Sequence, residues 1–254
     1  PSEVDATREA IEAQADAILG QLGEDAGAYD VVQLAYEHIA AHTDYVVESA
    51  HNQTIQSVFL GHASVCAGYA RAYQYLLNRA GVFCTYVEGS IASSGEDHAW
   101  DLVRIDGEYA YVDPTWADPT YADADAGTDA RGVIYDYLCL TTDEILRDDH
   151  VFADQTLWPT CDAPDLDYYR RSGRFFEWYD EADIDDSFWR QAGEGNRASF
   201  KFGSDESFAE AMAALAAGNF ERDGLLSLAS QAGENSIHYS YATSDALRIV
   251  KLYW

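Results

Sequence analysis

Cys66, His98 and Asp113 are three residues of different chemistry that together could perform acyl transfer. A cysteine can attack a carbonyl, a histidine can take the thiol proton and return it to the leaving group, and an aspartate can orient and stabilise the imidazolium. Such a set reacts with an amide or peptide bond through a thioester intermediate. We therefore interpret the three residues as the catalytic triad of a thiol-dependent enzyme.

The segment SVCAGYARAYQYLLNRAG predicts a helix that begins close to Cys66. Ser64 is a suitable N-cap and Gly81 a suitable C-cap, and between them apolar residues recur at helical spacing: Tyr69, Tyr73, Leu76, Leu77 and Ala80. The thiol then falls in the first turn. There the unpaired backbone N–H groups and the positive end of the helix dipole favour a thiolate, and the same groups can receive an oxyanion.

The segment HAWDLVRIDGEYAYVDPT predicts a β-hairpin that carries the other two residues. Asp106-Gly107 between two apolar runs is typical of a two-residue turn with positive φ. Counting outward from this turn places Trp100 opposite Asp113. Because side chains alternate between faces, His98 shares a face with Trp100, and Asp113 is its diagonal neighbour. A slip of one residue would move Asp113 to the opposite face.

Two strings, VCAGYARAYQYLLNRAGVFCTYVEG and HAWDLVRIDGEYAYVDPTWADP, resemble the transglutaminase-like superfamily in its bacterial secreted or surface form. YEHIAAHTDYVV and YDYLCLTTDEILRDDH extend the resemblance over residues 30–170, a domain-sized span. The resemblance implies a papain-like core with Cys66 on a helix and His98 and Asp113 on neighbouring strands. It also implies a protein or peptide substrate and an extracellular or cell-surface location.

Several other residues near these strings are candidates for the site. We expect contacts with the substrate from Trp100, Tyr69, Trp116 and Gln56, of which Gln56 is also a candidate for stabilising the oxyanion. The family often has Asn where this chain has Asp101, which should face away from His98 and have a structural or surface role. His62 is an alternative base, but it lacks a predicted carboxylate to orient it.

Composition excludes some classes of partner. The chain has 254 residues, of which 48% are hydrophobic, enough for a packed core. Its formal net charge of -30 repels nucleic acid and anionic lipid surfaces. No apolar run is long enough to span a bilayer, and the N-terminal segment is too charged for a signal-peptide core. Because the chain starts at Pro1, we expect an upstream signal or anchor to be missing from it.

The remaining cysteines and the histidine and aspartate clusters give little indication of a metal or cofactor. Cys84, Cys139 and Cys161 are expected to be buried free thiols, with one disulfide among them as the alternative. There is no C-x-x-C pair. His38 and His42 lie four apart, as zinc ligands can, but without the Glu of a metalloprotease motif. The series Asp123, Asp125 and Asp129 favours a solvated acidic loop over a calcium site. We expect no metal and no cofactor.

The chain as a whole predicts an α+β fold in two parts. Residues 3–46 have helical periodicity, residues 82–113 favour an antiparallel sheet, and residues 116–130 are loop-like. We therefore expect a catalytic domain with N-terminal helices over residues 1–190. Residues 195–254 read as a strand, two helices and a closing pair of strands, a small α+β unit.

The sequence leaves two classes of function open. The first is acyl transfer or hydrolysis at an amide or peptide bond of a protein or peptide, with amine or water as the acceptor. The second is a catalytically silent binding or scaffold module at the cell surface, because a fold does not guarantee its chemistry. A papain-family protease proper is a weaker fit, since His98 follows Cys66 closely and Asp113 replaces the expected Asn. Nothing in the residues indicates an oligomeric state.

Overall fold

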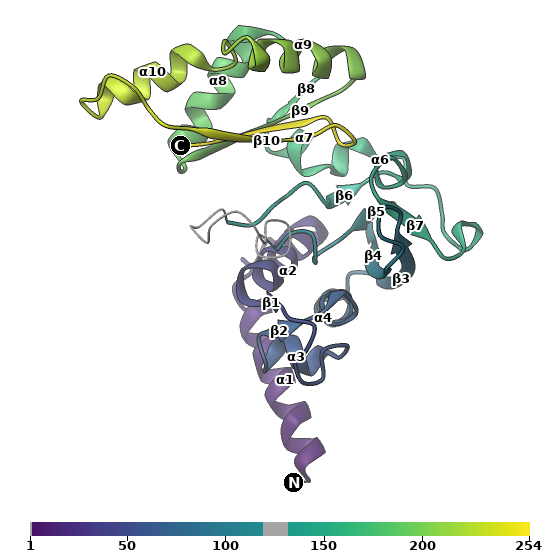
Figure 1. Ribbon diagram of the computed structural model, residues 1–254. Coiled ribbons are helices and arrows are strands. Elements are labelled where there is room, and N and C mark those ends of the chain that lie inside the picture. Colours follow the sequence, from purple (N-terminus) through teal and green to yellow (C-terminus); the bar gives the residue numbers. More distant parts are fainter. Residues whose placement is uncertain (1, 119–131) are drawn as a thin grey trace. The chain divides into compact units, whose positions relative to one another are not determined.

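The computed structural model describes residues 2–118 and 132–254 and is shown in Figure 1. It begins with the two predicted helices, α1 (Glu3–Leu19) and α2 (Ala28–His42). A capping box between Ser2 and Asp5 starts α1. Within the described residues, no helix combines the length and apolar character needed to cross a membrane.

Helix α4 (Cys66–Arg79) carries the cysteine at its first position, as predicted, but Ser64 is not its N-cap. The cap is Val65, whereas Ser64 belongs to the short strand β2 (Ala63–Ser64), which pairs in parallel with β1 (Asp44–Tyr45). The Ser64 hydroxyl instead donates to the Asn52 carbonyl oxygen at 2.7 Å. Gly68 permits this close packing, since a Cβ there would overlap Ser64 Oγ.

A five-stranded antiparallel sheet lies next to α4 in the N-terminal unit, with strand order β6-β5-β4-β3-β7. Its strands are β3 (Cys84–Ile91), β4 (Asp97–Ile105), β5 (Glu108–Val112), β6 (Leu138–Leu140) and β7 (His150–Phe152). The predicted hairpin register is confirmed, because Arg104 pairs with Tyr109 and Ile105 with Glu108. The turn residues Asp106 and Gly107 have φ of 51° and 101°, as a two-residue turn of this type requires.

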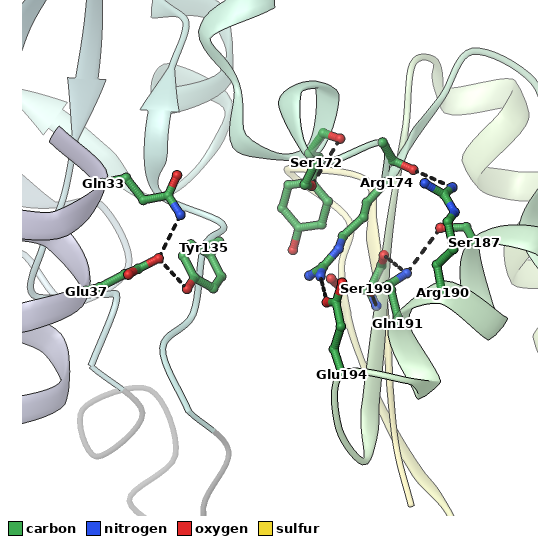
Figure 2. Close-up of polar contacts among 12 residues, drawn as sticks. Gln33, Glu37, Tyr135, Ser172, Arg174, Ser187, Arg190, Gln191, Glu194 and Ser199 are labelled. Carbon is green, nitrogen blue, oxygen red and sulfur yellow. Dashed lines mark hydrogen bonds and ion pairs between the residues drawn. The ribbon is translucent and has the colours of Figure 1, made fainter. Parts of the chain in front are cut away.

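Helices α2 and α4 and the sheet share one core. Its largest fully buried side chains in this unit are Trp100, Tyr36, Tyr69, Tyr73, Tyr111, Ile39 and Leu76. Polar contacts add to the packing of α2: Tyr135 donates to Glu37 Oε1 at 2.7 Å, and Gln33 donates to the same atom at 2.8 Å (Figure 2). Contacts within the chain define a first compact unit, Pro1–Asp167. In its described part, the remaining α-helices are α3 (Ile55–Phe59) and α6 (Thr142–Arg147).

The second unit, Tyr168–Trp254, contains the predicted C-terminal elements. After α7 (Tyr168–Arg171), strands β8 (Phe175–Phe176), β9 (Arg197–Phe202), β10 (Ser240–Ser244) and β11 (Ile249–Tyr253) form a sheet of order β10-β11-β9-β8. Helices α8 (Glu181–Ala192), α9 (Asp205–Ala216) and α10 (Arg222–Gln231) complete it. Gln191 ties α8 to β9, accepting from the Ser199 N–H at 2.8 Å and donating to its carbonyl oxygen at 3.1 Å (Figure 2).

The boundary between the units corrects the one expected from sequence. The first unit ends at Asp167, not at residue 190. The reason is α8, whose Ile184 and Phe188 are buried among the C-terminal aromatics Phe200, Phe202 and Phe220. A helix that buries its apolar face in the second core belongs to that unit.

Candidate active site

Cys66 and His98 line the same cavity in the N-terminal unit, which has a volume of about 720 Å³. Cys66 comes from the start of α4 and is partly exposed, whereas His98 comes from β4 and is buried. The rest of the wall is formed mainly by residues 45–53, the first turn of α4, strands β3 and β4, and Ala153. A thiol and an imidazole thus open onto a space large enough for a peptide side chain.

Asp113 contacts His98 through the geometry that the hairpin predicted. Asp113 Oδ2 lies 2.6 Å from His98 Nε2, and both side chains are almost fully buried. The other carboxylate oxygen, Oδ1, accepts the backbone N–H groups of Thr115 at 2.8 Å and Trp116 at 3.3 Å. Because Nε2 is occupied by the carboxylate, Nδ1 is the nitrogen left for Cys66, whose thiol is near enough to help raise the pKa of His98.

The electrostatics favour a charged imidazole at neutral pH. Burial alone would lower the pKa of His98, but the charge and hydrogen bond of Asp113, together with Cys66, raise it to about 10. Burial would raise the pKa of Asp113, but its two histidine neighbours hold it below its ordinary value. The arrangement can therefore keep an imidazolium beside the thiol and an ionised carboxylate behind it.

His150 also contacts the carboxylate, and the sequence analysis did not identify it. Its Nε2 lies 3.0 Å from Asp113 Oδ2, and its ring is buried. It comes from β7, a three-residue strand that pairs with β3, with Ile91 opposite His150. The string YDYLCLTTDEILRDDH ends at this histidine, but so short a strand carries no alternation that would indicate its partner.

Three side chains meet closely enough to raise the question of a metal. The potential ligand atoms of His98, Asp113 and His150 lie within 4.8 Å of one another. Among the residues whose positions are described, these three form the cluster of histidine, cysteine or acidic side chains that is close enough to hold a metal ion. However, Oδ2 is 2.6 Å and 3.0 Å from the two Nε2 atoms, which are hydrogen-bond distances. Ligands about 2.0–2.1 Å from a tetrahedral zinc would lie roughly 3.3 Å apart. The set is therefore better described as a hydrogen-bonded cluster.

The other metal candidates of the sequence have different surroundings. The rings of His38 and His42 stack at 4.2 Å, and His42 Nδ1 contacts the His38 carbonyl oxygen at 2.8 Å. Burial and the nearby His42 and His62 lower the pKa of His38 to about 4. His62 is exposed, lies close to the His42 carbonyl oxygen and does not line the Cys66 cavity. Asp123, Asp125 and Asp129 lie outside the described residues.

Trp100 and Trp116, which were expected to contact a substrate, do not line the Cys66 cavity and pack instead against His98. The ring centroids of Trp116 and Trp100 lie 5.3 Å and 5.9 Å from that of His98, and both pairs are stacked. Trp100 is fully buried, so it shields the histidine and does not contact a substrate. It packs against Gly89 of β3, where a Cβ would overlap the indole ring.

Tyr69 and Gln56 require correction as substrate contacts. Tyr69 is fully buried, with its hydroxyl 2.6 Å from both the Thr43 carbonyl oxygen and Asp118 Oδ2, so it anchors the core. Gln56 lies in α3 and does not line the cavity, whereas Gln53 does. The helical spacing of Tyr69 indicates that it lies on the buried face of α4. A buried face of a helix need not point toward the cavity that Cys66 lines.

Asp101 faces away from His98, as the alternation of side chains predicted. Of the two expected roles, structural or surface, the structural one applies. It is fully buried and its Oδ1 accepts a hydrogen bond from Cys84 Sγ at 3.4 Å. Burial raises its pKa well above the ordinary value. Cys84, Cys139 and Cys161 are buried free thiols, so the alternative of a disulfide among them is wrong.

A helix that begins at a cysteine and packs on an antiparallel sheet bearing a histidine and an aspartate defines a papain-like α+β fold, as expected from the sequence. Residues 15–114 match the family model described as the Transglutaminase-like superfamily. The matched segment includes Cys66, His98 and Asp113.

Comparison with individual proteins gives more distant similarities. Over 142 residues the chain is 29% identical to Kyphoscoliosis peptidase of Mus musculus, which aligns 50% of this chain with 21% of that protein. A structure of a TGase is 18% identical with a TM-score of 0.38, covering 52% of this chain and 36% of the other. A proposed cysteine protease from Cytophaga hutchinsonii is 18% identical with a TM-score of 0.38, covering 53% and 56%. The chain thus spans about a fifth of the mouse relative and a third to a half of the two structures.

Proposed function

We propose that this chain forms a thioester between Cys66 and the acyl group of a protein or peptide, and then passes that group to water or to an amine. The observation that carries the proposal is the position of His98. Its Nε2 lies 2.6 Å from Asp113 Oδ2, it lines the same cavity as Cys66, and the nearby thiol helps to raise its pKa. This is the order of groups that nucleophilic catalysis by a thiol needs.

The reaction would begin with a proton on His98 and a negative charge on Cys66. The Cys66 sulfur attacks the carbonyl carbon, and the carbonyl oxygen becomes an oxyanion. The backbone N–H of Cys66, at the first position of α4, has no intrahelical partner and can donate to it. When the carbon–nitrogen bond breaks, His98 gives its proton to the departing nitrogen and a thioester remains. Water or an amine then loses a proton to His98, attacks the thioester and releases Cys66.

The fate of the acyl group divides hydrolysis from transfer. The name peptidase of the mouse relative favours hydrolysis, and the superfamily name favours transfer. Incubation with a glutamine peptide and a labelled primary amine separates the two by product mass. Hydrolysis gives the free acid, and transfer gives the amine adduct. A protein or peptide substrate and an extracellular or cell-surface location stay part of the proposal.

The decisive test is the reactivity of Cys66 toward iodoacetamide at pH 7. We expect alkylation well above the rate of an ordinary thiol, and a loss of about tenfold or more in His98→Ala. Cys84, Cys139 and Cys161 are buried, and Cys66→Ala gives the background from them. Circular dichroism confirms that each variant is folded. If Cys66 reacts at the rate of an ordinary thiol, the silent binding module is the better hypothesis.

A further inference from the structure

His150 lies behind the carboxylate that contacts His98. Its Nε2 is 3.0 Å from Asp113 Oδ2, the same oxygen that His98 Nε2 approaches at 2.6 Å. Its side chain is fully buried. His150 does not line the cavity that Cys66 and His98 share. It therefore contacts the carboxylate without reaching a substrate in that cavity.

Neighbouring groups hold the His150 ring in this orientation. On the other side of the ring, Nδ1 lies 3.7 Å from Asp148 Oδ2. The ring centroid lies 4.3 Å from that of Trp116 and 4.9 Å from that of Trp100. The hydrogen bond at Nε2 fixes which way the ring points, the 3.7 Å distance at Nδ1 is that of an ion pair and not of a hydrogen bond, and the two indoles limit rotation of the ring.

The arrangement satisfies a buried charge. Asp113 Oδ1 accepts two backbone N–H groups, from Thr115 and Trp116, and Oδ2 contacts two imidazoles. A carboxylate in a dry site stays ionised only if donors replace its lost water. Of the two imidazoles, only that of His98 contacts Cys66. The His150 contact therefore stabilises Asp113 without taking part in the proton transfers.

We propose that His150 is a positioning residue of this centre, whose Nε2–H holds Asp113 Oδ2 in place against His98. This inference rests on the proposed acyl-transfer function of Cys66. Its action is indirect, because His150 orients the carboxylate that orients the base. In many active sites, residues that do not contact the substrate hold the catalytic side chains in their orientation and charge state, and His150 would act on His98 in this way through Asp113.

The charges around His150 determine the sign of a pH effect. The titratable groups that interact with it or with its carboxylate partners include Tyr36 from α2, His98 and Asp101 from β4, Asp113 after β5, Tyr137 before β6 and Asp148 after α6. Burial opposes a charge on His150, but Asp113 and Asp148 outweigh it and raise its pKa. Without His150, Asp113 keeps its burial and loses one of its two histidines. The pKa of Asp113 should then rise, so that the carboxylate loses its charge at a higher pH.

The test compares His150→Phe with His150→Gln in the full chain. Phenylalanine keeps a ring between the indoles but donates nothing, whereas the glutamine amide can still donate to Asp113. With p-nitrophenyl acetate as acyl donor, we expect His150→Phe to lower kcat by about ten- to a hundredfold and to leave KM within about twofold. In the pH profile of Cys66 alkylation by iodoacetamide, the acid limb of His150→Phe should lie at higher pH than that of wild type. His150→Gln should restore most of the rate and the position of the limb.

The outcomes distinguish this inference from the proposed function. If His98→Ala loses the Cys66 reactivity while His150→Phe keeps both the rate and the acid limb, the positioning role is overturned and the proposed function stands. If wild-type Cys66 is as slow as His98→Ala, the proposed function itself fails. A His150→Gln variant as slow as His150→Phe would assign His150 to packing alone. Should His150→Phe not fold, His150→Asn replaces it, since its shorter amide falls short of Asp113.

Discussion

The two faces of the β4–β5 hairpin each bury an aspartate, and the pKa values of the two carboxyl groups are shifted in opposite directions. Asp113 and Asp101 are both almost completely inaccessible to solvent. Asp113 contacts two histidines and two backbone N–H groups, and its pKa is lowered. Asp101 has the Cys84 thiol as its hydrogen-bond partner, Oδ2 has none among the described residues, and its pKa is raised.

Hydrogen-bond and charge partners, rather than burial, therefore decide the direction in which the pKa of each carboxyl group is shifted. Burial by itself favours the neutral acid at both positions. Only the face with His98 and His150 supplies enough donors and positive charge to reverse that preference. The charged face is the one that opens, through His98, toward Cys66 and the cavity. The neutral face belongs to the core, which explains why Asp101 need not be catalytic.

The largest expected effect comes from neutralising the charged face. Asp113→Asn should lower the rate of p-nitrophenyl acetate hydrolysis by about 10³–10⁴-fold, because the amide neither fixes the imidazole tautomer nor stabilises the imidazolium. It should also lower the free energy of unfolding by about 3 kcal/mol or more at pH 7, since buried histidines lose their charge partner.

The sign of its pH dependence is fixed by the lowered pKa of Asp113. The carboxylate contributes stability above its unfolded pKa of about 3.9, and that contribution is lost on acidification. Urea unfolding at pH 7 and at about pH 2.5, below the unfolded pKa, should therefore show a larger difference between wild type and Asp113→Asn at pH 7. An equal difference at both pH values would mean that Asp113 is not ionised in the fold.

A second, intermediate effect concerns the alkaline limit of activity. Because the pKa of His98 is raised to about 10, the imidazolium that protonates the leaving nitrogen is present below that pH and lost above it. Turnover of an amide substrate such as a glutamine peptide should fall about tenfold per pH unit above this limit. In Asp113→Asn the limb should move to lower pH, and in Asp101→Asn it should stay in place. A limb that moves equally in both variants contradicts the assignment of the two faces.

The smallest effect is expected on the neutral face. Asp101→Asn keeps an uncharged group of the same shape and should leave catalytic rates within about twofold of wild type. Because the folded pKa of Asp101 is raised, wild type must retain a proton there that its unfolded chain releases above about pH 3.9. The variant avoids this cost. Its free energy of unfolding should thus rise relative to wild type between pH 5 and pH 8, by at most about 1.4 kcal/mol per unit.

The control for the neutral face is Cys84→Ala. It removes the thiol that donates to Asp101 and should cost about 1–3 kcal/mol of stability without changing the reactivity of Cys66. Urea unfolding and iodoacetamide alkylation measure the two effects separately. A loss of Cys66 reactivity in either Asp101→Asn or Cys84→Ala would show that the two faces are coupled.

Much of the fold follows from local sequence pattern. The Asp106-Gly107 turn sets the hairpin register, and alternation then assigns His98 and Asp113 to one face and Asp101 to the other. The helix of Cys66 and the C-terminal order of strand, two helices and two strands are equally local signals. These features need only neighbours along the chain or across a two-residue turn.

The features that sequence reasoning missed depend on contacts between distant segments. His150 reaches Asp113 because β7 pairs with β3 at the far edge of the sheet order. Tyr69 was expected at the substrate, yet its hydroxyl meets Thr43 and Asp118 in the interior. Helix α8 belongs to the second unit because its apolar face is buried among the aromatic residues of that unit.

Local sequence was enough to indicate which residues could react and which face of the hairpin each occupies, since backbone geometry fixes these over a few residues. The direction in which the pKa of each buried carboxyl group is shifted depends instead on the packed fold. That direction depends on how many donors several strands bring to one carboxylate, and the pairing of distant strands is not encoded in any single segment. The pKa of Asp113 is lowered because His98 and His150 converge on it, and the pKa of Asp101 is raised because burial there is offset only by the Cys84 thiol.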